Sequence, residues 1–147
     1  EKLYLSLKKL GLTSSDIKEY YNLSHKIGIP QINTENLQNK IFGIECNLDE
    51  LKAIDFKKGC YVGQENTARI KLKDKLNKRL LPVEIIEGNI EDEIISEESK
   101  EIGKIIIKDE NPFAVIKFKS EQFKFNKIFR CGSAKIKIKK PDWLNIT

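Results

Sequence analysis

Lys135-Ile136-Lys137-Ile138-Lys139 alternates lysine with isoleucine, the period of two that a β-strand shows when one face is buried and the other meets water. Working outward, further apolar runs predict strands at residues 80–85, 102–107 and 113–118. Turn residues separate these runs at 88–89, 109–112 and 132–133. Five or six short strands with such turns predict a small antiparallel β-barrel, and Pro82 predicts that the first strand is an edge or contains a bulge.

The residues before this region carry helical signals. Residues 13–16 offer several N-cap side chains, apolar residues follow at helical spacing from Ile17, and the segment 28–30, Gly-Ile-Pro, ends the pattern. A short helix is expected after Asn33-Thr34, and another begins near Asn47, where the Asn side chain would cap it. Residues 63–71 are expected to be helical as well.

The charge distribution argues against a nucleic-acid surface. The 147 residues are 39% hydrophobic and 33% charged, and the net charge is +5. Acids dominate residues 84–110, however, and bases dominate 117–140, so the two stretches would neutralise each other as neighbouring antiparallel strands. The lysines of 135–139 are then expected on a solvated face. Since no run of 18 apolar residues occurs, we expect no membrane span.

The cysteines and the single histidine exclude a closed zinc site. Cys46, Cys60 and Cys131 form no C-x-x-C pair, and His25 is the only histidine, which indicates reduced thiols in a cytosol-like compartment. The chain starts at Glu1 and contains no Met, so we expect it to be a piece of a longer protein.

One segment concentrates features that packing does not require, namely Lys58-Gly59-Cys60-Tyr61-Val62-Gly63-Gln64-Glu65. Its glycines favour tight turns that let another molecule approach the backbone. If Cys60 is exposed, the lysines before it favour the thiolate. Gln64 and Glu65, in the first turn of a helix, can cap backbone N–H groups or hold a ligand. A second interpretation stays open: Cys60 is a buried small hydrophobe, the glycines are turn residues and Glu65 is a cap.

All eight positions of this segment resemble the signature of the YgfZ family, folate-binding relatives of the glycine-cleavage T-protein that act in iron–sulfur protein maturation. The flanks are similar to family elements too, and in the same order: Gly28-Ile29-Pro30, Glu45-Cys46-Asn47-Leu48-Asp49, Ala68-Arg69, Lys78-Arg79-Leu80 and Pro141-Asp142-Trp143. The resemblance covers most of the chain. It identifies the chain as similar to the C-terminal half of the family, without the N-terminal half that carries a ferredoxin-like portion.

The resemblance implies an α+β fold in two parts. Residues 1–74 would be the C-terminal part of a T-protein-like folate-binding domain, and residues 75–147 a C-terminal antiparallel β-barrel. It also implies tetrahydrofolate as the ligand of the complete protein, with Glu45 hydrogen-bonded to the pterin; Tyr61 would shape the wall of the pocket, and Gln64 and Glu65 would orient the loop. Arg69 would meet the glutamate tail of the folate or pair with an acid.

Cys60 is the residue expected to carry the chemistry, as a nucleophile, a redox thiol or a transient cluster ligand, with Lys58 favouring its thiolate. Cys46 and Cys131 are expected to serve packing. No resident metal is expected.

The leading hypothesis is a non-catalytic accessory factor for [4Fe–4S] proteins, in the bacterial cytoplasm or the mitochondrial matrix, with folate and iron–sulfur assembly proteins or client apoproteins as partners. A true aminomethyltransferase is one alternative; the T-protein has an aromatic and usually an acid where this chain has Cys60-Tyr61, which counts against it. A module for tRNA binding or modification is the other.

Overall fold

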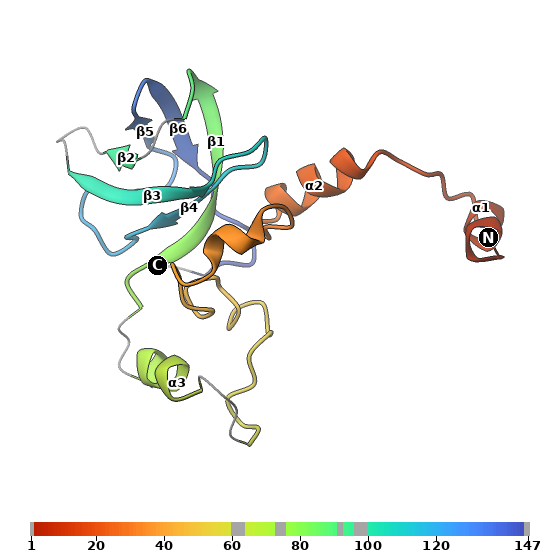
Figure 1. The fold of residues 1–147 in the computed structure, drawn as a ribbon, viewed down its shortest axis with the longest axis horizontal. Coiled ribbons are helices and arrows are strands. Elements are labelled where there is room, and N and C mark those ends of the chain that lie inside the picture. Colours follow the sequence, from red (N-terminus) through yellow and green to blue (C-terminus); the bar gives the residue numbers. More distant parts are fainter. Residues whose placement is uncertain (1, 60–63, 73–75, 91–92, 96–99, 146–147) are drawn as a thin grey trace.

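The computed structural model describes residues 2–59, 64–72, 76–90, 93–95 and 100–145 (Figure 1). In these residues six strands form a closed antiparallel barrel, hydrogen-bonded in the order β1-β4-β3-β2-β5-β6 and back to β1. The strands are β1 (Arg79–Glu87), β2 (Glu93–Ile95), β3 (Glu101–Ile107), β4 (Phe113–Ile116), β5 (Ile128–Cys131) and β6 (Ala134–Ile138). Together with the helices that precede them, they confirm the expected α+β class and the antiparallel sheet.

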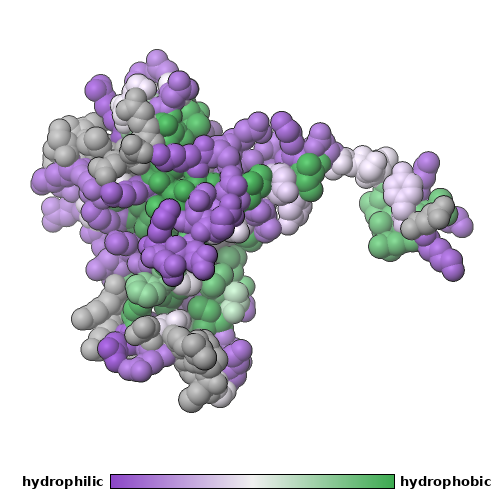
Figure 2. Space-filling model, in the orientation of Figure 1, coloured by the Kyte–Doolittle hydropathy of each residue, from purple (hydrophilic) through white to green (hydrophobic). Residues whose placement is uncertain are grey.

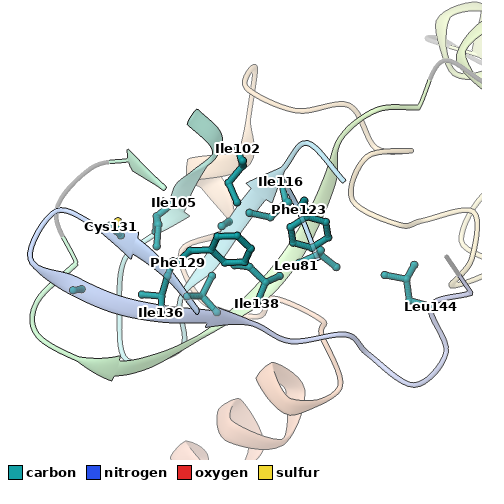
Figure 3. Close-up of a cluster of buried hydrophobic side chains, with 13 residues drawn as sticks. Leu81, Ile102, Ile105, Ile116, Phe123, Phe129, Cys131, Ile136, Ile138 and Leu144 are labelled. Atoms are coloured by element: carbon teal, nitrogen blue, oxygen red, sulfur yellow. The ribbon is translucent and has the colours of Figure 1, made fainter. Parts of the chain in front are cut away.

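The barrel is filled by apolar side chains of β1, β3, β4, β5 and β6. Ala134, Ile136 and Ile138 of β6 are buried, whereas Lys135 and Lys139 between and beyond them are exposed, as the alternation predicts. Figure 3 shows Phe129 of β5 among the isoleucines of the other strands, with Leu144 at one end of the cluster. Phe123 stacks on Phe129 with ring centroids 5.9 Å apart.

Gly103 is required where β3 and β4 approach each other. It faces Ile116 across the two strands, and a Cβ there would overlap the carbonyl oxygen of Val115. A glycine inside a strand commonly marks such a close backbone approach.

Of the two alternatives predicted for the strand that contains Pro82, the edge is wrong, and an irregularity is present in β1 but not at Pro82. Residues 79–82 of β1 pair with β4, and residues 83–87 pair with β6, so the strand has partners along its whole length. Pro82 lies where the strand changes partner, and its carbonyl accepts a hydrogen bond from Lys139 N–H at 3.0 Å. Proline has no N–H to donate, and it lies where the partner strand of β1 changes from β4 to β6. The irregularity of β1 lies further along the strand, between Ile85 and Glu87.

The acidic and basic stretches neutralise each other across the barrel strands, as the charge pattern predicts. Lys137 and Lys135 of β6 lie opposite Glu84 and Glu87 of β1. Lys135 Nζ is 2.6 Å from Glu87, and its hydrogen bond lowers the pKa of that carboxyl. Lys139 Nζ is 3.0 Å from Glu84. These lysines form a solvated, paired face.

Three of the expected helical segments are present, and one helix was not predicted. The helices are α1 (Lys2–Lys9), α2 (Ile17–Lys26), the 3₁₀ helix η1 (Thr34–Leu37) and α3 (Gln64–Leu72). The Asp16 side chain caps α2 by accepting the N–H of Lys18 at 2.9 Å, and Gly28 with φ 78° follows its end. The unpredicted α1 has no buried residue and stands away from the rest of the molecule (Figure 1).

The helix predicted from Asn47 is absent, because residues 44–52 form a series of turns. Asn47 has φ 63°, a left-handed conformation, and its side-chain amide donates to the carbonyl of Leu80 at 2.7 Å. Its side-chain oxygen, the atom that would cap a helix, instead accepts from Arg79 Nη1 at 3.2 Å. Lys52, with φ 59°, closes the turns.

Residues between α1 and α3 contact the barrel and the segment that follows it. His25 of α2 lies edge-on to the ring of Phe113, and its Nε2 is 3.0 Å from the carbonyl oxygen of Pro112. Trp143 Nε1 donates to the carbonyl of Ile27 at 2.7 Å. A second apolar cluster joins Leu80, Ile107 and Phe113 of the barrel to Leu37, Ile41 and Cys46. The division between residues 74 and 75 stays a prediction. Within the described ranges, no helix has the length and apolar character needed to cross a membrane.

Candidate functional site

The predicted motif is described only at its two ends. Residues 60–63 lie outside the described residues. They include Cys60, the residue expected to carry the chemistry, and Tyr61. Before them, Lys58 is exposed, and the Asp55 carboxylate accepts the N–H of Lys57 at 2.8 Å. At Gly59 a Cβ would meet no atom within 4 Å, so the space beside this glycine is open.

At the end of the motif, Glu65 pairs with Arg69, which lies further along α3. Arg69 Nη2 is 2.5 Å from Glu65 Oε1, and both side chains are exposed. They are four residues apart on one helix, an arrangement that stabilises helices by a few tenths of a kcal/mol. Of the two expectations for Arg69, pairing with an acid is thus the one observed. Gln64 begins the helix.

The end of α3 is held against the segment that precedes the motif. Lys71 Nζ is 2.9 Å from Asp49 and lies 3.9 Å from the centroid of the Phe56 ring. The ion pair and the cation–π contact both bring the helix to residues 49–56. The two ends flanking residues 60–63 are therefore connected through side chains as well as through the chain.

A buried polar network attaches the turns of residues 44–52 to the start of β1. Arg79 is 8% exposed, donates to Asn47 Oδ1 at 3.2 Å and forms an ion pair with Glu50. Asn47 is 1% exposed and also bonds the Leu80 carbonyl. In the described part of the molecule, Glu50 Oε2 and Arg79 Nε have no hydrogen-bond partner. In the sequence Arg79 stands out only as part of Lys78-Arg79-Leu80, and Glu50 does not stand out, because an Arg at the start of a strand and an acid far before it in the chain give no local signal.

Glu45 lies in the same turns, half-buried, beside this network. Its Oε2 accepts the N–H of Phe42 at 2.9 Å, and its carbonyl accepts the N–H of Leu80 at 2.9 Å. The carboxylate thus closes its own turn. Its expected hydrogen bonds to a pterin stay a prediction.

The two described cysteines have the packing roles that were expected. Cys131 is fully buried in the barrel core. Cys46 packs against the second apolar cluster, and burial, with the Glu45 charge adding to it, raises the pKa of its thiol to about 11. A thiol with so high a pKa is inert at neutral pH.

Two grooves on the described surface lie away from the predicted folate-binding residues within the described ranges. A groove of about 350 Å³ lies between α2 and the barrel, and one of about 140 Å³ lies beside β3 and β4. Glu45, Glu65 and Arg69 line neither of them. Among the residues with a described placement, no three His, Cys, Asp or Glu side chains gather as metal ligands. No folate step follows from this geometry.

No family model matches the chain. Three relatives have the name "Iron-sulfur cluster assembly factor IBA57 homolog, mitochondrial". The relative from Aspergillus oryzae is 44% identical over 62 residues, which are 42% of this chain and 14% of the relative. The one from Pyricularia oryzae is 41% identical over 78 residues, 53% of this chain and 19% of the relative. The one from Dictyostelium discoideum is 34% identical over 93 residues, 63% of this chain and 23% of the relative.

The match therefore covers less than a quarter of each of these three relatives. Over that part, the identities are high enough for common descent. The homologues of this chain are iron–sulfur cluster assembly factors that bear a mitochondrial designation in their names.

Proposed function

We propose that the protein containing this chain is an accessory factor for the assembly or repair of iron–sulfur proteins of the [4Fe–4S] type. The observation that carries the proposal is the similarity to relatives named as iron–sulfur cluster assembly factors. On the same names we propose the mitochondrial matrix as its location. The Lys58 to Glu65 segment is the part of the chain proposed to act.

The surroundings of the motif support a role for it at the surface. Lys58 and Gly59 on one side and Glu65 on the other are exposed, and the space beside Gly59 is open. Behind them, the Lys71–Asp49 pair and the buried Arg79–Glu50 pair connect α3 and residues 44–52 to the barrel. The exposed residues on either side of positions 60–63 can therefore meet another protein.

Within this proposal, Cys60 acts as nucleophile, redox thiol or transient cluster ligand. Iron–sulfur clusters are usually held by four cysteines. Cys131 is buried in the core, and the raised pKa of Cys46 keeps its thiol protonated at neutral pH. A cluster ligated by Cys60 would therefore take its other ligands from a partner or from a small thiol.

Replacement of Cys60 tests this role in the complete protein. In cells that lack the endogenous factor, Cys60→Ala should abolish the activity of [4Fe–4S] enzymes while the protein accumulates normally. Cys46→Ala is the matched control, because it removes an inert thiol nearby in the sequence and should preserve those activities. Normal [4Fe–4S] enzyme activity with Cys60→Ala would contradict the role of Cys60.

Folate binding is a further part of the proposal, for the complete protein. Glu45, Tyr61, Gln64, Glu65 and Arg69 are the proposed binding residues, and the carboxylate of Glu45 suits paired N–H donors of a pterin. Because that carboxylate already accepts the Phe42 N–H, the ligand would have to share it. Calorimetric titration of tetrahydrofolate into the complete protein should show binding that Glu45→Ala weakens. An absence of heat with the unaltered protein would remove folate from the proposal.

Catalytic turnover separates this proposal from the aminomethyltransferase alternative. The complete protein should release no ammonia from an aminomethyl-lipoyl carrier when tetrahydrofolate is supplied. Steady tetrahydrofolate-dependent release would instead establish an enzyme of the T-protein kind.

A further inference from the structure

The N-terminal arm, which we define as residues 2–12, exposes an apolar helix face. Leu3, Leu7 and Leu10 are 72%, 39% and 75% exposed, and they follow the i, i+4, i+7 spacing that places side chains on one face of a helix. Three more apolar residues of the arm are exposed as well: Tyr4, Leu5 and Leu12. Because α1 has no buried residue, nothing in the described part of the molecule covers this face.

The charge on the arm has one sign. Its charged residues are Lys2, Lys8 and Lys9, and the last two lie in the final turn of α1. The nearest acids are Glu1 before the arm and Asp16, which caps α2 after it. None of the ion pairs between described residues involves the three lysines. The arm therefore combines an apolar face with a local excess of positive charge.

The place of the arm lets both features meet an extended surface. α1 stands away from the barrel (Figure 1), and residues 10–16 join it to α2 without helix or strand. Apolar and hydrophilic residues lie side by side on the arm (Figure 2). A helix of eight residues is about 12 Å long, whereas the hydrocarbon core of a bilayer is ~30 Å thick. Such a helix can lie on a membrane but cannot cross one.

We propose that the N-terminal arm binds the surface of a membrane that contains anionic lipids. A basic amphipathic helix lies in the plane of the interface, where its apolar face enters the boundary of the acyl chains and its lysines reach the anionic headgroups. A tyrosine such as Tyr4 suits the same depth. A second copy of the chain would shield the leucines but would bring the same lysines, so it would leave their charge without a counterpart. The inference goes beyond the proposed role in cluster assembly and does not rest on it.

The test is co-sedimentation of this chain with vesicles at low ionic strength. The vesicles contain either phosphatidylcholine alone or equimolar phosphatidylcholine and phosphatidylglycerol. The chain should bind the anionic vesicles about tenfold or more tightly than the neutral ones, and added salt should weaken that binding.

Two variants of the arm separate the apolar contribution from the charge. Leu3→Ser/Leu7→Ser removes apolar area and keeps the lysines, and Lys8→Glu/Lys9→Glu reverses charge and keeps the leucines. Each should weaken binding to the anionic vesicles about tenfold or more. Because α1 buries no residue, both variants should keep the free energy of unfolding of the unaltered chain.

Lys57→Glu/Lys124→Glu is the matched control for net charge, since it reverses two exposed lysines outside the arm. Binding that persists in this control and is lost in both arm variants supports the proposal. An equal loss in the control and in the lysine variant of the arm overturns it, as does unchanged binding in the leucine variant. Absence of binding by the unaltered chain also overturns it, and sedimentation velocity then shows whether a second copy occupies the arm instead.

The complete protein supplies the last comparison. It should bind the anionic vesicles as this chain does, with the same dependence on the leucines and lysines of the arm. Binding by this chain alone would mean that the rest of the complete protein covers the apolar face, and the proposal would be wrong.

Discussion

Cys46 connects the chemistry of one side chain to the stability of the fold. Its pKa is raised to about 11, from an ordinary value of 9.0, because burial disfavours the thiolate. Between these two pH values the unfolded chain has lost the proton and the folded chain keeps it. The raised pKa therefore stabilises the fold fully below about pH 9, and this stabilisation is lost as the pH rises toward 11.

Two measurements check this behaviour. The free energy of unfolding in urea should fall as the pH rises from 9 to 11. In the Cys46→Ala variant, the free energy of unfolding should fall less steeply over the same range. At pH 8, Cys46 should react with a thiol reagent about a hundredfold more slowly than an ordinary cysteine, since its thiolate fraction is lower in that proportion. Labelling at the ordinary rate would contradict the buried, protonated thiol.

Arg79 and Glu50 form a pair whose loss should be costly. Arg79→Met removes a buried cation and leaves Glu50 with an uncompensated charge, so we expect a destabilisation of about 3 kcal/mol in urea unfolding. The double variant Arg79→Met/Glu50→Gln removes both charges and should recover part of that loss. If the two single changes simply add in the double variant, the two side chains are not coupled.

At the scale of an element, Gly28 is another position where one substitution should lower the stability. It lies just after α2 and contacts the segment that follows β6. Its φ is 78°, and a Cβ there would overlap the ring of Pro141, next to the Trp143 that bonds Ile27. Gly11 has a similar φ of 76°, but a Cβ there would meet nothing within 4 Å. A Cβ therefore adds a steric overlap at Gly28 and none at Gly11.

Gly28→Ala should destabilise the protein by more than the ~1 kcal/mol of a strained backbone, because the overlap with Pro141 adds to it. Gly11→Ala is the control: Gly11 follows α1, which stands away from the rest of the molecule, so the free energy of unfolding should stay within about 0.5 kcal/mol. Urea unfolding measured by Trp143 fluorescence gives both values. An equally small change in both variants would mean that the strain and the overlap at Gly28 are relieved without cost.

The elements also show what local pattern can predict. The strand at 134–138 and helix α2 follow from periodicity, caps and stop signals, all of which act between near neighbours in the sequence. Local pattern mispredicts Asn47 and Pro82 because their structure depends on partners far away in the sequence. The Asn47 amide donates to the Leu80 carbonyl, and at Pro82 the partner strand of β1 changes from β4 to β6. The site divides in the same way. The Lys58 to Glu65 motif can be recognised in the sequence. The ion pairs Lys71–Asp49 and Arg79–Glu50 are tertiary contacts, and no local sequence pattern predicts them.

At the scale of the whole molecule, the hydrophilic barrel contrasts with an apolar N-terminal arm. Figure 2 shows hydrophobic residues at the surface of the N-terminal arm, where Leu3 of α1 is 72% exposed and Leu10, just after the helix, is 75% exposed. An eight-residue helix with no buried residue is marginal on its own. Exposed apolar residues gathered in this way favour association between molecules.

Deletion of residues 1–12 should therefore reduce self-association in sedimentation velocity and leave the free energy of unfolding within about 0.5 kcal/mol. Leu3→Lys/Leu7→Lys, which keeps the arm and changes its apolar face, should act in the same direction. A large loss of stability on deletion would show that the arm belongs to the folded unit.

The exchange of partners at Pro82 has a consequence for how the chain is synthesised. The first half of β1 can pair once β4 has left the ribosome, but the second half waits for β6, about fifty residues after it in the sequence. Until then its amides remain with water and the core beneath it is open, and pairings of such sequence separation form slowly. We therefore expect a partly paired state during synthesis, which lasts at least until the ribosome has made β6.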